Sequence, residues 1–308
     1  MNGTLPSAIV DAHHHLWQLA DGRYPWLQDG YDARAFFLGD YGALQADFGA
    51  GAYRARTEGL NIVATVHVEA ERHRAESLAE TRWLHAMHAK HGFPNAVVAH
   101  VDLLAQDADA QLRQHLEWPL VRGVRCKPLT APGATGSVRG QPGALQDARW
   151  HAGLALLCAR DLAWDLRVPC WHLEEAAEAI ARVPALRVVL EHAGLPWDRS
   201  ETGLAHWRRG MAALAALPNV HVKLSEFGLP DAPWDAGSTV RVIRETVAIF
   251  GWQRCMFASN LPVSGLRVAM PELVRTVSEA LAGLDAEARD GIWRGNALRF
   301  YRIDAAGR

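Results

Sequence analysis

Residues 8–15 read AIVDAHHH, a short apolar run that ends in three histidines. Short runs of apolar and β-branched residues are typical of strands that are buried on both faces of a parallel sheet. Further runs of this kind lie at residues 61–69, 96–102, 121–126, 162–167, 186–192, 220–225 and 255–259. We therefore predict eight strands, the first of which, at residues 8–13, carries the histidines at its carboxyl end.

Helical patterns separate the predicted strands. Helix formers with apolar residues near one face occupy residues 75–91, 151–159, 174–182, 205–217, 239–250, 271–284 and 286–299. Ser238 or Thr239 is expected to cap the helix that starts at 239. Eight alternations of strand and helix predict a single (β/α)8 TIM-barrel domain over residues 1–308. A doubly wound sheet is the alternative, but its Gly-x-Gly-x-x-Gly phosphate turn does not occur in the sequence.

The composition narrows the class of protein. The 308 residues include 32 basic and 34 acidic side chains, a net charge of −2, which disfavours nucleic acid as a partner. The four cysteines form no Cys-x-x-Cys pair, and no stretch approaches the roughly 18 apolar residues of a membrane span. The first residues also lack a signal-peptide pattern. We expect a cytoplasmic protein with a small-molecule substrate and no membrane partner; a homodimer is compatible with this interpretation.

Two long segments interrupt the alternation. Residues 16–41 and 130–146 are irregular connections, and the second is rich in Gly, Pro, Ala and Ser. Each follows a predicted strand, so in a barrel both lie at the C-terminal face, where active sites form. Loops of this length are uncommon unless they are functional or mobile. Trp17 in the first loop offers a flat apolar wall with an N–H group for a ring-shaped ligand.

The histidines of the first strand are the sharpest local signal. Residues two apart in a strand point to the same side, so His13 and His15 should converge inside the barrel while His14 points outward. Two imidazoles on one face can chelate one divalent metal ion if other elements add ligands. A histidine-rich strand end that bonds to loop backbone is the alternative, since the chain contains 15 histidines.

Polar residues recur near the ends of other predicted strands, where a barrel interior would otherwise be apolar. His192 ends the sixth strand, and Lys223 in the seventh would be a buried ammonium, which is rare without a partner or a task. Arg122 and Arg125 lie three apart, so at most one of them points inward. The remaining candidates are His67 and Glu69 in the second strand and Asp165 in the fifth.

Taken together, these stretches resemble the amidohydrolase-related lactonase branch of the amidohydrolase superfamily. That branch includes sugar-acid lactonases and relatives that open 2-pyrone-4,6-dicarboxylate. The matching stretches, from residue 10 to residue 263, read VDAHHHLW (10–17), VHVEA (66–70), VRGVR (121–125), DL (165–166), LEHAGLP (190–196), VKLS (222–225) and ASNLPV (258–263). Their order and spacing make the resemblance specific, and it implies a TIM barrel that hydrolyses a lactone.

The resemblance also implies roles for individual residues. His13, His15 and His192 correspond to histidines that bind a metal or polarise a carbonyl, and Arg125 corresponds to a substrate-binding residue. The superfamily places an aspartate, a metal ligand and general base, where this chain has Asn260. An amide cannot act as a general base. One divalent cation, with zinc first among the candidates, is therefore expected together with metal-independent catalysis as an alternative.

We hypothesise that the protein opens a small sugar-acid or related carboxylated lactone with an activated water. His13, His15 and Lys223 would polarise the carbonyl, His192 would accept the water's proton, and Asn260 would orient that water. The substrate-binding candidates are Arg125, Arg122, His67, Glu69, Asp165 and Trp17. A decarboxylase or hydratase of an unsaturated acid on the same barrel is one alternative. A non-catalytic sugar-acid binding protein is another.

Overall fold

The computed structural model describes residues 5–230 and 232–304, whose strands form one parallel sheet in chain order. Each strand pairs in parallel with the next one along the chain. The strands are β1 (Ile9–His14), β2 (Ile62–Val68), β3 (Ala96–Ala99), β4 (Val121–Val124), β5 (Ala163–Leu166), β6 (Val188–Leu190), β7 (Val220–Leu224) and β8 (Cys255–Phe257). All eight predicted strands are therefore confirmed: β1 is shifted by one residue from the predicted 8–13, and the other seven are shorter than their predicted runs.

The two ends of the sheet meet just beyond β8. His14 and Leu261 form a parallel bridge, and His15 N donates to Leu261 O at 2.8 Å. The amide of Asn260 donates to His13 O at 2.7 Å. The sheet is thus a nearly closed barrel with helices between its strands, which confirms the predicted (β/α)8 fold.

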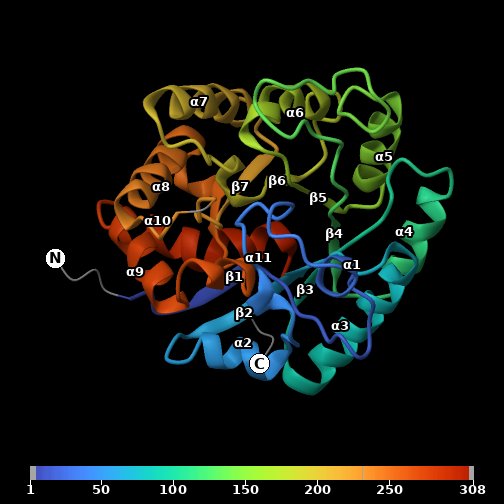
Figure 1. The fold of residues 1–308 in the computed structure, drawn as a ribbon, viewed down its shortest axis with the longest axis horizontal. Coiled ribbons are helices and arrows are strands. Elements are labelled where there is room, and N and C mark those ends of the chain that lie inside the picture. Colours follow the sequence, from blue (N-terminus) through green and yellow to red (C-terminus); the bar gives the residue numbers. More distant parts are fainter. Residues whose placement is uncertain (1–4, 231, 305–308) are drawn as a thin grey trace.

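Helices surround the barrel (Figure 1). The helices are α1 (Pro25–Gln28), α2 (Ala50–Arg56), α3 (Ser77–His91), α4 (Ala108–Leu116), α5 (Ala148–Ala159), α6 (Leu173–Ile180), α7 (Glu201–Ala215), α8 (Ala236–Phe250), α9 (Met270–Leu281), α10 (Ala286–Asp290) and α11 (Asn296–Tyr301). The sequence pattern did not predict α1, α2 or α4. The N-cap of α8 is Asp235, whose side chain accepts from Ser238 N at 3.0 Å, so the predicted cap at Ser238 or Thr239 was wrong.

The barrel interior is apolar below the strand ends. Small and branched residues of the strands, such as Val10, Val66 and Val98, are fully buried in one cluster with residues of α11. Tyr301 of α11 reaches far enough to donate from its hydroxyl to Asp165 at 2.7 Å. The last helix therefore packs against the barrel interior, and its Tyr301 reaches the buried carboxylate of Asp165.

The two long loops differ in what they do. In residues 16–41 only α1 is regular, and this loop is tied down by Trp17, which exchanges backbone hydrogen bonds with Phe48 at 3.0 Å. In Figure 1 this segment crosses the middle of the ring of helices. Residues 130–146 contain no helix or strand, and the loop is pinned by the bond from Leu129 N to Gly143 O at 2.9 Å.

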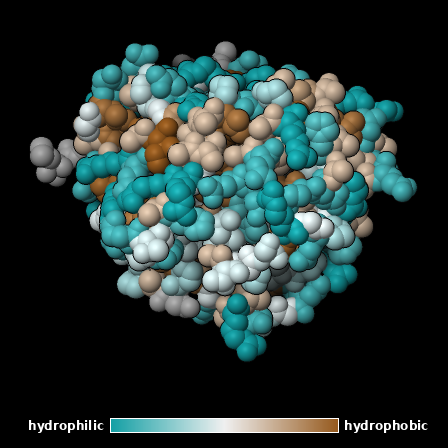
Figure 2. All heavy atoms as spheres, turned by 90° about the horizontal axis from the view of Figure 1, so that it is seen from above, coloured by the Kyte–Doolittle hydropathy of each residue, from teal (hydrophilic) through white to brown (hydrophobic). Residues whose placement is uncertain are grey.

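The next feature is the distribution of apolar residues over the surface and along the helices. The face in Figure 2 is mostly hydrophilic, and its apolar residues form separate patches. Within residues 5–230 and 232–304, every helix is too short or too polar to cross a membrane.

Asp11 joins the first and last strands to α2. It is fully buried, accepts from Ser259 N at 2.8 Å and Ser259 Oγ at 2.6 Å, and accepts from the Tyr53 hydroxyl at 2.8 Å. Burial raises the pKa of this carboxyl, against the hydrogen bonds from Ser259. Asp11 therefore stabilises the closed barrel through the donors that it satisfies.

We predict that Asp11→Asn lowers the free energy of unfolding by about 3 kcal/mol, because the new amide hydrogens would face existing donors. Urea denaturation followed by circular dichroism measures this change. Glu58→Gln, at an exposed position after α2, is the control and should leave the denaturation midpoint unchanged. Equal midpoints for wild type and Asp11→Asn would contradict the role of Asp11.

Candidate functional site

A cavity of about 420 Å³ opens at the C-terminal ends of the strands. Its wall combines residues that follow β1, β2, β4, β5, β6 and β8 with residues of the 16–41 loop. The lining residues are His15, Trp26, Ala35, Phe36, Phe37, Ala70, Glu71, Arg125, Lys127, Arg167, His192, Trp197, Asn260 and Val263.

A buried ion pair lies deepest in the barrel. The Lys223 ammonium donates to Asp165 Oδ2 at 2.5 Å, and both side chains are fully buried. Lys223 Nζ also lies 3.4 Å from His13 Nδ1 and 5.4 Å from the centre of the Tyr301 ring. The structure therefore brings both predicted residues beneath His13, where they position this ring without lining the cavity.

Arg125 sits at the centre of a second buried charge network. Its Nε donates to Glu69 Oε1 at 2.7 Å, and its Nη1 donates to Glu191 Oε2 at 3.3 Å. Nη2 donates to the backbone oxygen of Glu69 at 2.5 Å. Burial alone would raise the pKa of Glu69, but the charges of Arg125 and Arg74 lower it. Two glutamates thus occupy most of the donors of Arg125.

The histidines converge above these networks. His13 and His15 face each other with Nε2 atoms 3.2 Å apart, whereas His14 packs on the Tyr53 ring, outside the barrel interior. The predicted orientation of the three residues is therefore confirmed. The His192 ring lies 4.7 Å from that of His13, centre to centre, and its Nδ1 is 2.8 Å from the hydroxyl of Ser225.

The donors in this group suit a divalent cation. Ligand atoms of His13, Glu191 and His192 all lie within 4.8 Å of one another, and His15 adjoins them through its contact with His13. Imidazole nitrogens and carboxylate oxygens are the ligands that zinc uses in catalytic sites. Glu191 Oε1 is buried and has no hydrogen-bond partner among the described residues. A buried acceptor without a partner is suited to bind a cation.

The protonation states also fit cation binding. Burial, assisted by the positive charge of Lys223, lowers the pKa of His13 well below its usual value. Burial and the charge of Arg125 lower the pKa of His15 to about 3. The rings are therefore neutral at pH 7, with lone pairs available for a metal ion. Glu191 was missed as a ligand from sequence, although it stands directly before His192.

A second polar layer lines the cavity above the first. Lys127 and Arg167 stand two residues beyond Arg125 and Asp165, respectively, and both line the cavity. Lys127 pairs with Glu71, whereas Arg167 lies with its guanidinium carbon 5.3 Å from the centre of the Phe37 ring and forms no ion pair within residues 5–230 and 232–304. The period of two that paired His13 with His15 could have identified these residues as well.

Aromatic rings form the outer wall. Trp26 stacks on Phe36 with ring centres 5.9 Å apart, and Phe37 stacks on Trp197 at 5.7 Å. Trp17 does not reach the cavity: it is fully buried and packs edge-on against Trp26 at 5.6 Å. The structure thus places Trp17 behind a cavity-lining indole, so any effect on a ligand passes through Trp26.

Of the predicted substrate-binding residues only Arg125 lines the cavity: Trp17, Asp165 and Glu69 lie behind it, and His67 and Arg122 are also outside its wall. His67 is fully buried and contacts Leu16 O through Nε2 at 3.3 Å. Arg122 Nη1 donates to Val121 O at 3.1 Å, and its side chain lies near the charges of Arg187 and Asp304. Arg122 thus lies near the N-terminal end of β4. Arg125 follows the last residue of the strand and lines the cavity.

Strained backbone marks the ends of several strands. Glu71, His192, Glu226 and Asn260 have φ angles of 57°, 59°, 47° and 56°, in the left-handed region that these residues rarely adopt. Such strain clusters at functional sites, where the surrounding structure has to hold it in place. Glu71 and Glu226 are the members of this set that sequence reasoning did not consider.

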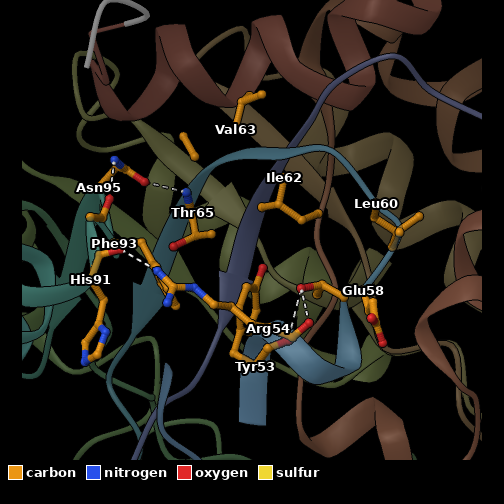
Figure 3. A pocket seen from close by; sticks show the side chains of 14 residues that line it. Tyr53, Arg54, Glu58, Leu60, Ile62, Val63, Thr65, His91, Phe93 and Asn95 are labelled. Atoms are coloured by element: carbon orange, nitrogen blue, oxygen red, sulfur yellow. Dashed lines mark hydrogen bonds between the residues drawn. The ribbon is translucent and has the colours of Figure 1, made fainter. Parts of the chain in front are cut away.

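A second cavity of about 390 Å³ lies at the other end of the barrel (Figure 3). It lies among α2, the start of β2 and the residues after α3, where Arg54 Nη2 donates to His91 O at 2.8 Å. Among the described residues, none of the predicted site residues lines this cavity. The polar group at the C-terminal end is therefore the candidate active site.

Comparisons with known proteins identify the family of the chain. The Amidohydro_2 family model, described as amidohydrolase, matches residues 10–303. The chain is 31% identical over 299 residues to the uncharacterized protein y4mH of Sinorhizobium fredii, covering 96% of this chain and 99% of that protein. It is also 31% identical over 309 residues to L-fucono-1,5-lactonase of Burkholderia multivorans, covering 96% of each chain. The crystal structure of a zinc-bound amidohydrolase from B. multivorans has a TM-score of 0.79 and 28% identity, covering 97% of this chain and 100% of that one.

We predict that the purified protein binds about one divalent cation per chain after dialysis against zinc and removal of the free ion. His13→Ala and His192→Ala should each lose most of it, because each removes a neutral imidazole ligand. Inductively coupled plasma mass spectrometry measures the content, and the exposed His151→Ala is the control. Full occupancy in both site variants would show that the cation is held elsewhere.

Proposed function

Because the chain belongs to the amidohydrolase family, we propose that it is a hydrolase that opens a lactone carrying a carboxylate. The observation that carries this proposal is the unbalanced cation on the cavity wall. Arg125 and Lys127 are paired with glutamates, whereas Arg167 forms no ion pair with a described residue. Burial lowers the pKa of Arg167, but a guanidinium remains charged at neutral pH.

We propose that Arg167 binds the substrate carboxylate, in place of Arg125, which was expected from the sequence to do so. A planar guanidinium recognises a carboxylate through two parallel hydrogen bonds, which requires that its donors be available. Three of the five donor hydrogens of Arg125 are occupied by Glu69 and Glu191, whereas Arg167 forms no ion pair with a described residue. We therefore assign Arg125 to positioning Glu191, and Arg167 to substrate binding with Lys127 beside it.

The aromatic wall suits the ring of a lactone. Phe36, Phe37, Trp26 and Trp197 offer apolar faces on one side of the cavity. Trp197 Nε1 is buried without a hydrogen-bond partner among the described residues, so it can donate to a ring substituent. A small carboxylated ring would thus meet a cation at one edge and apolar surfaces on its faces.

Hydrolysis joins a water oxygen to the carbonyl carbon, breaks the bond from this carbon to the ring oxygen, and delivers a water proton to the ring oxygen. We propose that His13, His15, Glu191 and His192 hold one divalent cation, with zinc as the expected ion. When bound, such an ion supplies Lewis acidity to the carbonyl oxygen. Lys223 and Asp165 keep His13 in place from below.

His192 is a weak candidate for the general base. Burial, together with the charges of Arg167 and Lys223, lowers the pKa of His192 well below its usual value. A base with so acidic a conjugate acid takes up a proton poorly at neutral pH. We therefore assign His192 to cation binding, and the hydrogen bond that the water donates to Asn260 Oδ1 becomes the main orienting contact.

We predict that the protein hydrolyses 2-pyrone-4,6-dicarboxylate with a higher kcat/KM than the uncharged L-fucono-1,5-lactone. Arg167→Gln should raise KM for the carboxylated lactone about 30-fold, as expected for loss of a charged hydrogen bond, and change KM for the uncharged one little. Acid release followed in a pH-stat measures both.

The exposed Arg209→Gln is the matched control and should match wild type. Release of carbon dioxide instead of acid would show that the protein is a decarboxylase and not a lactonase. Binding of these lactones without any turnover, in protein that contains zinc, would leave only a binding function.

A further inference from the structure

Glu226 and Asn260 form a buried pair at the edge of the cavity. Glu226 follows β7 and is 2% exposed, and Asn260 follows β8 and is also 2% exposed. Asn260 Nδ2 donates to Glu226 Oε2 at 2.5 Å. Asn260 lines the cavity, whereas Glu226 lies behind it. Both residues adopt left-handed backbone angles, so the fold holds the pair in place at a local conformational cost.

The hydrogen bond fixes which end of the amide is free. An ionised carboxylate only accepts hydrogen bonds, so it must face the NH₂ group of Asn260 and not its oxygen. The oxygen, Asn260 Oδ1, is buried and has no partner among the described residues. Because such an acceptor costs free energy when it is left unpaired, it is suited to a water or a substrate hydroxyl in the cavity.

We propose that Glu226 is a positioning residue that fixes the Asn260 amide with Oδ1 as the acceptor facing the cavity. Protonation of Glu226 would release this constraint, because a carboxylic acid can donate to Oδ1 and turn the NH₂ group toward the cavity. The effect on turnover rests on the proposed lactone hydrolysis, whereas the amide orientation does not.

The charges around Glu226 set the pH at which the constraint appears. Burial raises the pKa of Glu226 to about 7, against the hydrogen bond from Asn260, the backbone of Gly228, and the charges of Arg167 and Arg267. Arg167 follows β5 and Arg267 follows the segment after β8, so cations face the carboxyl from two sides. Glu226 is therefore ionised above about pH 7, and the amide oxygen faces the cavity there.

The first test observes the amide itself and needs no substrate. In the full-length protein labelled with ¹⁵N-asparagine, the Asn260 side-chain amide is assigned by its absence in Asn260→Asp. Its signals should shift from about pH 5 to about pH 9 with a midpoint near 7, and Glu226→Gln should abolish the shift. Glu80→Gln, which replaces another buried glutamate with a raised pKa, is the control and should leave the shift intact. A signal that ignores pH, or that titrates equally in Glu226→Gln, would overturn the proposal.

The second test measures turnover of the carboxylated lactone in a double-mutant cycle. Glu226→Gln should lower kcat about tenfold with KM nearly unchanged, because the amide is no longer held in one orientation. Asn260→Asp should lower it similarly, because two adjacent carboxyls must share a proton. In the double variant the new amide donates to the new carboxylate, which presents an acceptor oxygen again, so kcat should return to within about threefold of wild type.

A double variant about a hundredfold below wild type, the product of two independent losses, would show that Glu226 has only a structural role. Thermal unfolding of each variant confirms that it is folded before its kinetics are compared. Absence of lactone turnover in the wild type would reject the proposed function but leave the amide test valid, so the two failures are distinguishable.

Discussion

The candidate site depends on the buried contact between Arg125 and the two glutamates Glu69 and Glu191. All three side chains are at most 4% exposed, and removal of one partner from a buried ion pair typically costs about 3 to 5 kcal/mol. The requirement to satisfy Arg125 fixes the carboxylate of Glu191, which faces His13 at 3.5 Å and His192 at 3.6 Å. The same residues that neutralise the arginine thus assemble the group that we propose holds a cation.

The alternation of strand residues arranges the charges in two layers. The deeper layer contains Asp165, Lys223 and Arg125, whose charges are matched within the protein. The layer two residues further along holds Lys127 and Arg167 at the cavity, where Arg167 is left for a ligand. In the proposed function, the deep charges therefore act mainly by positioning the histidines and by lowering their pKa values, and Arg167 contacts the substrate.

Much of the fold could be predicted from the sequence, because every strand of this barrel is a short apolar run and most of the runs are separated by helical patterns. The convergence of His13 and His15 followed from the period of two. Glu226 could not be found in this way, because the chain leaves the extended conformation after Leu224 and the alternation no longer says which way a side chain points. The pairing of Arg125 with two glutamates from other strands is likewise a tertiary contact that no local pattern records.

The proposed function depends on two roles: Arg167 binds the substrate carboxylate, and Arg125 holds Glu191 in place. A crystal structure with the ring-opened product of 2-pyrone-4,6-dicarboxylate tests these roles most directly. We predict that a product carboxylate lies within hydrogen-bond distance of the Arg167 guanidinium, with Arg125 still bound to Glu69 and Glu191. A product carboxylate bound to Arg125, with one of these glutamates displaced, would contradict the account.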